Sequence, residues 1–344
     1  MIADPCEGAG LPLRRGRAGR IVLALVGSWL AVGAQAQSID TSTGSSRAPA
    51  SKVLGDGAKG HGTFSVELAS TLVNGFRATN DELESNLVVR GFNAQFALDY
   101  FLTDHWSVSV GIPYVMNKYV GPPDAHCPTA NFPRCAGFPV LEKPRPKDQF
   151  LDDGNYHSDW QDWTFGTAWH TRVGDWMLTP ALEVTIPSHS YTFFQNAAVG
   201  QRLWRVEPSI TVAHQFQFTN LYYQLYYGYA FTQRHLGVNT NYHHLYGELG
   251  YFVNPRVAVR LFAIGKFGGG LQASQIGPLT QGLTSDYWYR HDQINTHQYA
   301  GIGTGVDWQF SNHYGLSASV QKLIWGKSIF NFRYIAELRL TRSF

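Results

Sequence analysis

Long hydrophobic runs are almost absent from this chain of 344 residues. A membrane-spanning helix requires about 20 consecutive apolar residues, and the apolar run that comes closest covers 21–32, near the N-terminus. Elsewhere, apolar residues alternate with polar ones in segments of about ten residues. The sequence therefore excludes a helical membrane protein, although 44% of its residues are hydrophobic.

Charge and cysteine are also scarce. Charged residues make up 15% of the chain and leave a net charge of +2, with no basic block of the kind that binds nucleic acid. The 13 histidines are scattered, so we expect no metal site and no cofactor. Cys127 and Cys135 lie in one Pro-rich stretch, where we expect a disulfide in an exported, oxidising setting. Zinc binding by this pair with His126 is the alternative, but no further ligand spacing follows.

The N-terminal segment reads as a targeting sequence. Arg14, Arg15, Arg17 and Arg20 precede the apolar run, and Ala34-Gln35-Ala36 follows it. Basic residues, a short apolar run and a small-residue cleavage site mark a signal peptide. We expect a signal peptide over 1–36, a flexible periplasmic segment over 37–60, which alternatively tucks into the barrel, and a β-barrel over 61–344.

The C-terminal stretch alternates apolar and polar residues. One parity carries the apolar side chains Phe330, Phe332, Tyr334, Ala336, Leu338, Leu340 and Phe344. Arg333, Glu337 and Arg339 lie on the other parity, and the side chains of a strand point alternately to opposite faces. A strand with an apolar outer face and an aromatic C-terminus resembles the closing strand of bacterial outer-membrane β-barrels. This resemblance implies that Phe344 belongs to the signal read by the barrel-assembly machinery.

About twelve segments with this alternation predict the strands of an antiparallel transmembrane β-barrel, with ten or fourteen as the nearest alternatives. They cover 64–72, 87–100, 106–117, 160–172, 176–186, 203–218, 221–232, 242–252, 257–267, 298–310, 314–324 and 330–344.

The connections between these segments alternate in length. Short turns at 102–105, 173–175, 219–220, 253–256 and 311–313 interleave with connections that are mostly longer, notably 118–159, 187–202 and 268–297. Outer-membrane barrels have short periplasmic turns and longer extracellular loops. A soluble β-sandwich or propeller, the alternative, has no reason to alternate its loop lengths in phase. The pattern therefore favours an all-β barrel in outer-membrane lipid.

The inward parity predicts charged side chains that line the lumen. They are Glu67, Asp99, Asp162, Arg172, Glu183, Arg205, Glu207, Glu248, Arg260, Lys266, Asp307, Arg333, Glu337 and Arg339. Both signs of charge occur, so two interpretations stay open. The residues either pair with one another and stiffen the barrel, or they act on a permeating solute.

No stretch of the sequence predicts a catalytic residue. A phospholipase barrel of the outer-membrane type uses a His-x-Ser pair near the outer leaflet, whereas His105-Trp106-Ser107 lies at a predicted periplasmic turn. Ser188-His189-Ser190 is in a predicted outer loop but lacks the spacing of a strand face. We therefore expect the protein not to be an enzyme.

Two stretches resemble the outer-membrane family named for the meta-pathway of phenol degradation. The first runs from Asp99-Tyr100-Phe101 through Trp106 to Gly111-Ile112-Pro113-Tyr114, and the second from Trp160-Gln161-Asp162-Trp163 to Ile186-Pro187. In the second, Asp162 and Pro187 match the family pattern, whereas its flanking glycines and its threonine-glycine are missing. The resemblance implies passage of a small-molecule solute, hydrophobic or aromatic, across the outer membrane. The alternatives are a structural or adhesive barrel with partner-binding loops and, third, an outer-membrane hydrolase.

Overall fold

The computed structural model describes residues 59–121, 150–272, 275–276 and 286–344, and in this part of the chain the strands close into a ring. β1 (Gly62–Arg77) pairs antiparallel with β14 (Ile329–Ser343) on one side and with β2 (Leu83–Phe101) on the other. From β14 the antiparallel pairing runs back along the chain, strand by strand, to β3 (Trp106–Val120), which pairs with β2. No edge strand is left, so the barrel is closed.

The sheet has fourteen strands, but three short ones occupy a single position in the ring, so the barrel has twelve strand positions. β4 (Tyr156–Trp160) and β5 (Trp163–Trp169) both pair with β3. β6 (Thr171–Val173) continues in the same position and pairs with β7 (Trp176–Ile186). The remaining strands are β8 Arg205–Gln215, β9 Leu221–Thr232, β10 Tyr242–Asn254, β11 Val257–Gly268, β12 Gln298–Gln309 and β13 Tyr314–Lys327. The antiparallel barrel of about twelve strands predicted from the sequence is confirmed.

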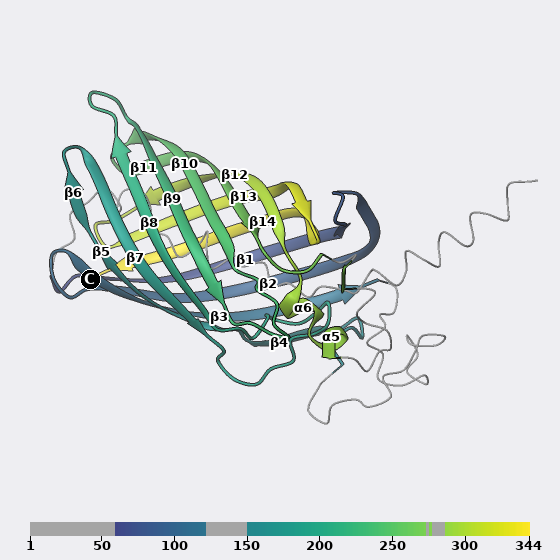
Figure 1. Ribbon diagram of the computed structural model, residues 1–344. Coiled ribbons are helices and arrows are strands. Elements are labelled where there is room, and N and C mark those ends of the chain that lie inside the picture. Colours follow the sequence, from purple (N-terminus) through teal and green to yellow (C-terminus); the bar gives the residue numbers. More distant parts are fainter. Residues whose placement is uncertain (1–58, 122–149, 273–274, 277–285) are drawn as a thin grey trace, which may run out of the picture. The chain divides into compact units, whose positions relative to one another are not determined.

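The two ends of the barrel differ in their connections (Figure 1). One end carries the turns 102–105, 174–175, 216–220, 255–256 and 310–313 together with the C-terminus; we call it the short-turn end. The other, the loop end, carries the connections 78–82, 121–155, 187–204, 233–241 and 269–297, and the single residue Ser328. The short helices α5 (Asp286–Tyr289) and α6 (His291–Ile294) lie in the connection 269–297. The predicted short turns therefore all lie at one end.

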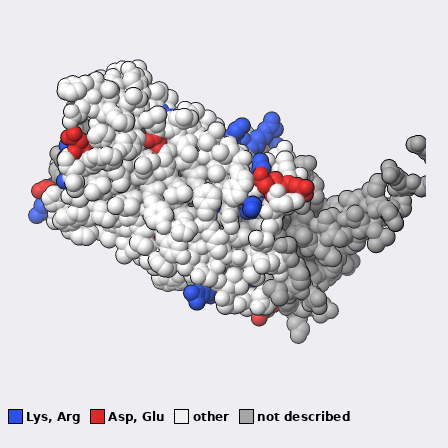
Figure 2. Space-filling view, turned by 45° about the horizontal axis from the view of Figure 1, so that its top comes forward, with Lys and Arg blue, Asp and Glu red and all other residues white. Residues whose placement is uncertain are grey.

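The outer face of the barrel is apolar. Alternate residues of the strands are exposed leucine, isoleucine, valine and aromatic side chains, such as Leu68, Phe92, Leu249 and Ile302. Figure 2 shows a broad uncharged band around the middle of this face, with most visible charges toward the ends. Near the short-turn end the rings of Trp106 and Trp169 lie 4.9 Å apart. No helix in the described residues is long and apolar enough to cross a membrane.

The closing strand departs from the predicted alternation. Leu72 of β1 pairs with Tyr334, and the next residue, Val73, pairs with Phe332, so Arg333 has no partner across this ladder. An extra residue in one strand reverses which face the later side chains occupy. Phe332 is accordingly buried at 3% exposure, and the Arg333 side chain is exposed. The prediction that Arg333 lines the lumen, with Phe330 and Phe332 outside, is therefore wrong.

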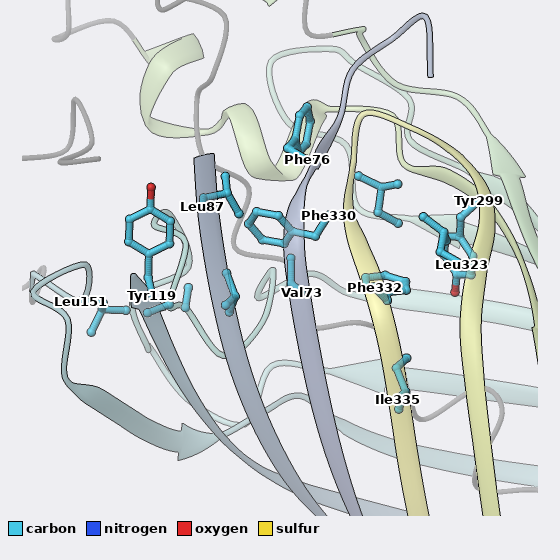
Figure 3. Packing of buried hydrophobic residues seen from close by; sticks show 14 residues of the cluster. Val73, Phe76, Leu87, Tyr119, Leu151, Tyr299, Leu323, Phe330, Phe332 and Ile335 are labelled. Atoms are coloured by element: carbon cyan, nitrogen blue, oxygen red, sulfur yellow. The ribbon is translucent and has the colours of Figure 1, made fainter. Parts of the chain in front are cut away.

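This reversal builds an apolar collar inside the loop end. Val73 and Phe76 of β1 lie beside Phe330 and Phe332 of β14 (Figure 3), and the rings of Phe76 and Phe330 meet edge to face at 6.2 Å. The same cluster includes Leu87, Val89, Tyr119, Tyr299, Leu323, Ile329 and Ile335 from the neighbouring strands. The sequence predicted a lumen lined by polar side chains, whereas the structure has an apolar cluster on the inner face at the loop end.

Truncation of the collar tests its contribution to stability. Phe330 is 1% exposed, whereas Leu338, further along β14, is 47% exposed on the outer face. We expect Phe330→Ala to lower the free energy of unfolding by about 3–5 kcal/mol, because it leaves a cavity in a packed cluster. Leu338→Ala removes only a lipid contact and is the matched control. Denaturant unfolding of both variants in lipid vesicles measures the difference; equal losses would contradict the inward placement of Phe330.

Candidate functional site

A belt of charged side chains lines the inner wall and runs from the loop end at Arg205 toward the short-turn end at Asp307. The Arg205 guanidinium of β8 lies between two carboxylates. Its Nη2 is 3.1 Å from Glu183 Oε1 on β7, and its Nε is 3.8 Å from Glu207 Oε2 on β8. His244 Nδ1 is 3.0 Å from Glu207 Oε1, and Tyr226 donates its hydroxyl proton to the same oxygen at 2.5 Å. This part of the belt is therefore tied together across four adjacent strands.

The next part of the belt centres on Arg260 of β11. Its Nε lies 3.2 Å from Asp307 Oδ2 on β12, and its Nη1 lies 3.5 Å from Glu248 Oε2 on β10. Glu248 also accepts hydrogen bonds from the hydroxyls of Tyr222 and Tyr246. One arginine thus joins two carboxylates on the strands to either side of it.

The belt continues across the seam between β14 and β1. Arg339 of β14 donates from Nη2 to Glu67 Oε2 on β1 at 2.6 Å. Glu337 accepts a hydrogen bond from the Ser319 hydroxyl at 2.6 Å and one from the Gln321 amide at 3.3 Å. Arg339 therefore neutralises Glu67, while serine and glutamine hold Glu337.

The remaining residues predicted to line the lumen are Asp99, Asp162, Arg172 and Lys266; of these, Lys266 adjoins the belt through Tyr242, whose hydroxyl accepts a hydrogen bond from Arg205 Nη1 at 2.8 Å. Asp99 is half-buried on β2, and Asp162, between β4 and β5, accepts the hydroxyl proton of Tyr191 at 2.6 Å. Lys266 lies with its Nζ 4.0 Å from the ring centroid of Tyr242. Arg172 is exposed beside the turn at 174–175, at the short-turn end.

Several predicted features lie outside the described residues. They are the signal peptide 1–36, most of the segment 37–60, and the cysteine pair Cys127 and Cys135. Phe344 is described: its backbone exchanges two hydrogen bonds with Gly62 of β1, at 2.9 and 3.0 Å, and its ring is exposed. Its role in assembly stays a prediction.

Within the belt, carboxylates outnumber arginines. Glu67, Glu183, Glu207, Glu248, Asp307 and Glu337 share Arg205, Arg260 and Arg339, and the ion pairs join neighbouring strands. Removal of one partner from such a buried pair costs about 3–5 kcal/mol, since the other charge is left uncompensated. The pairing favours the interpretation that these groups stiffen the wall, and the acidic excess leaves the belt negative on balance.

Parts of three loop-end connections fill the barrel at the level of the collar. Residues 151–152, 193–199 and 291–297 are buried, and we call them the plug. Ala197, Ala198 and Leu151 belong to the same apolar cluster as the inner-face residues of β1, β2 and β14. Asn117 of β3 donates to the Ala198 carbonyl at 2.8 Å. The plug therefore packs against the inner wall.

Buried polar contacts hold the parts of the plug together. Asp152 accepts hydrogen bonds from the Asn196 amide at 2.8 Å and from the Ala197 backbone N–H at 2.9 Å. The Gln195 side chain accepts the backbone N–H of Leu151 at 2.5 Å. Because unpaired buried polar groups are costly, these bonds lock 151–152 onto 195–197.

His297 anchors the plug to the loop-end hairpin of β13 and β14. Its Nδ1–H donates to the Ser328 carbonyl at 2.9 Å. Burial, with the positive charge of Lys266 as the next cause, lowers the pKa of His297 to about 3. The imidazole is therefore neutral in the folded protein at pH 7.

The depressed pKa of His297 predicts a loss of stability at acid pH. The unfolded chain takes up a proton near pH 6.5 and the folded protein only near pH 3, so stability falls as pH drops through this window. At pH 5 we expect a loss of about 2 kcal/mol relative to pH 7.5 from this group. His297→Asn retains a donor for Ser328 and removes the titration. Unfolding free energies at both pH values should show a flatter pH dependence for the variant; an unchanged dependence would contradict the assignment.

The structure also brings together three side chains that the sequence did not connect. Ser188 Oγ lies 2.9 Å from His189 Nδ1, and His189 Nε2 lies 3.1 Å from Asp159 Oδ2. The Ser188 hydroxyl donates its proton to the Trp160 carbonyl oxygen at 3.0 Å. The spacing argument against Ser188 assumed a strand face, whereas Ser188 and His189 lie in a bend beyond β7. Asp159, from β4, is far away in sequence, and no local pattern could have indicated it.

Metal binding finds no support in the described part of the chain, which contains no cluster of three or more His, Cys, Asp or Glu arranged to hold an ion. The charged or nucleophilic side chains described toward the loop end include part of the belt, residues of the plug, and Ser188, His189 and Asp159 at the rim.

Comparison with known proteins bears on the fold. No family model and no curated protein matches the sequence. Among solved structures, an outer-membrane channel from Pseudomonas putida F1 is 12% identical, with a TM-score of 0.61 over 83% of this chain and 96% of that chain. The KdgM porin (7% identity, TM-score 0.42, 81% and 99% covered) and the CymD monoaromatic hydrocarbon channel (9%, 0.40, 83% and 89%) are more distant and carry no argument. The likeness to the Pseudomonas channel shows a shared fold, a β-barrel of the outer-membrane type.

Proposed function

We propose that the chain is an outer-membrane channel for small molecules with an apolar or aromatic body. The observation that carries the proposal is the divided interior, in which an apolar, partly aromatic collar and a charged belt line different parts of the inner wall of a closed barrel. The plug packs against the cluster that contains Phe76, Phe330 and Phe332. When the plug is displaced, these rings offer a path of low desolvation cost to an apolar solute.

The proposal includes location and orientation. A signal peptide over 1–36 exports the chain, the assembly machinery recognises the strand that ends at Phe344, and the apolar outer face contacts lipid. The short-turn end faces the periplasm and the loop end faces outward, as in outer-membrane barrels generally. A disulfide between Cys127 and Cys135 closes a small loop outside.

Loosening of the plug tests the channel. Asp152 ties 151–152 to Asn196 and Ala197, and each buried hydrogen bond left unmade costs about 1–3 kcal/mol. We expect Asp152→Ala to raise the uptake rate of benzyl alcohol into liposomes about tenfold over the wild-type protein. Asp153→Ala is the matched control, because Asp153 binds only Asn155 and His157 outside the plug.

The channel proposal would be contradicted if liposomes with the wild-type protein, with Asp152→Ala and with Asp153→Ala all took up benzyl alcohol no faster than empty liposomes. That result would favour the structural or adhesive alternative, in which the loops bind a partner. Planar-bilayer conductance of the same variants provides an independent measure of plug opening.

A hydrolase is the second candidate, and the contact of Ser188 with His189 and Asp159 favours it. A serine whose proton passes to a histidine held by a carboxylate is the arrangement that acyl transfer uses. Ser188 Oγ would bond to the carbonyl carbon of an ester after its hydroxyl turns from the Trp160 carbonyl to His189 Nδ1, which takes the proton and passes it to the departing alcohol. Water then releases the acid by the same route. His189 and Asp159 are 44% and 40% exposed, so a substrate has access.

A serine-directed fluorophosphonate tests this candidate. If the three residues act together, the probe labels Ser188 in the folded wild-type barrel, and His189→Gln slows labelling at least a hundredfold by removal of the base. Ser190→Ala, beside the group, should label as the wild type does. Absence of label on the wild-type protein, read by peptide mass spectrometry, would remove the hydrolase candidate.

A further inference from the structure

Three basic side chains meet at the rim of the loop end, and each comes from a different connection. Arg202 belongs to 187–204, His235 to 233–241 and Arg290 to 269–297. Arg290 Nη1 lies 2.9 Å from His235 Nδ1. Gln201 donates to the Asp292 carbonyl at 2.7 Å and Gln293 donates to the Gln201 carbonyl at 2.9 Å, so the segments that carry the two arginines are bound to each other.

Neither arginine forms an ion pair in the described part of the chain. Arg202 donates from Nη1 to the Ser190 hydroxyl at 3.1 Å and to the Tyr191 carbonyl at 2.7 Å. Arg290 donates from Nη1 to the Gln293 side chain at 2.8 Å. The nearby acids are engaged elsewhere: Asp162 with the Tyr191 hydroxyl, and Asp292 with His291 at 3.2 Å.

The unused edges of the two guanidinium groups are the ones that recognise carboxylates. Among the residues that the structure describes, each arginine uses only Nη1 for its hydrogen bonds, which leaves Nε and Nη2 with donors to offer. A guanidinium presents its N–H groups in a planar fork that fits a carboxylate with two parallel hydrogen bonds. Both side chains are half-buried, so they remain reachable from solvent.

His235 adds a third donor without a partner. Because Arg290 can only donate to it, Nδ1 must accept, and the ring proton lies on Nε2. That nitrogen is buried and makes no hydrogen bond. Burial, followed by the charges of Arg290 and Arg202, lowers the pKa of His235. An oxyanion there would relieve the repulsion and offer an acceptor.

Aromatic side chains lie directly beside the two arginines. The Arg202 guanidinium carbon is 4.6 Å from the ring centroid of Phe193. Phe193 meets Tyr289, the neighbour of Arg290, at 5.1 Å, and Phe194 meets Tyr289 at 4.9 Å. Charged donors and rings are therefore adjacent, which suits a ligand with an anionic end and a flat apolar body.

We propose that Arg202 and Arg290 form a binding site at the rim of the loop end for a small carboxylate with an apolar or aromatic body. The carboxylate bonds to the free edges of the guanidinium groups, and the body lies against Tyr289. The site rests on the proposed function, whose solute class it narrows to organic acids, and it captures the solute before the solute reaches the plug and the collar.

Calorimetric titration of the full-length barrel in a non-denaturing detergent tests the site. We expect benzoate to bind, and benzamide, its uncharged analogue, to bind at least tenfold more weakly. Acetate should also bind more weakly, because it lacks the ring. Arg202→Gln and Arg290→Gln should each weaken benzoate binding about tenfold or more, through loss of one bidentate pair.

Arg234→Gln is the matched control, since Arg234 is exposed and lies next to His235 in sequence; its affinity for benzoate should equal that of the wild type. Arg290→Lys keeps the charge without the fork and should bind with intermediate affinity, which separates recognition from misfolding. Equal binding of benzoate and benzamide, or wild-type affinity in both glutamine variants, overturns the inference. Inorganic phosphate binding as tightly as benzoate also overturns it, in favour of a lipid-phosphate site.

The uptake assay separates this inference from the channel proposal. Liposomes that take up benzyl alcohol through a protein that fails to bind benzoate overturn the carboxylate site alone. Benzoate binding that depends on both arginines, in a barrel that passes no solute, overturns the channel alone.

Discussion

The closed ladder of backbone hydrogen bonds is the constraint on which the rest of the structure depends. Lipid offers no partner for a backbone N–H or C=O group, so a sheet in a membrane must have no edge. The ring closes where β1 meets β14, and pairing extends to the last residue, with Gly62 and Phe344 bonded in both directions. Within the strands, side chains are then free to specialise, since the ladder satisfies the backbone groups there.

The bulge at Arg333 shows how much one residue changes within that ladder. Below it, β14 places Glu337 and Arg339 inside and Leu338 outside; above it, Phe332 and Phe330 face inward. The same strand therefore contributes to the charged belt and to the apolar collar. The plug has an apolar surface to pack against because of this reversal.

Alternation in the sequence was sufficient to predict the strands, the short turns and the outer face, because a period of two follows directly from the pleat. It failed at Arg333, because a bulge depends on the register with β1. It could not predict the plug, since residues 193–199 and 291–297 have no periodicity and are buried only by contacts between separate connections. Likewise, the ion pairs of the belt, the meeting of Ser188 with Asp159, and that of Arg202 with Arg290 depend on tertiary distance.

The belt also covers only part of the inner wall. Its carboxylates and arginines come from β7, β8, β10 to β12, β14 and β1. On β2 the residue in register with Glu67 is Gln95. Uncharged polar side chains such as Asn93 of β2 and Thr164 of β5 follow there. Charge is therefore distributed unevenly around the inner wall, so the electric potential inside the barrel depends on the position around the ring as well as on depth.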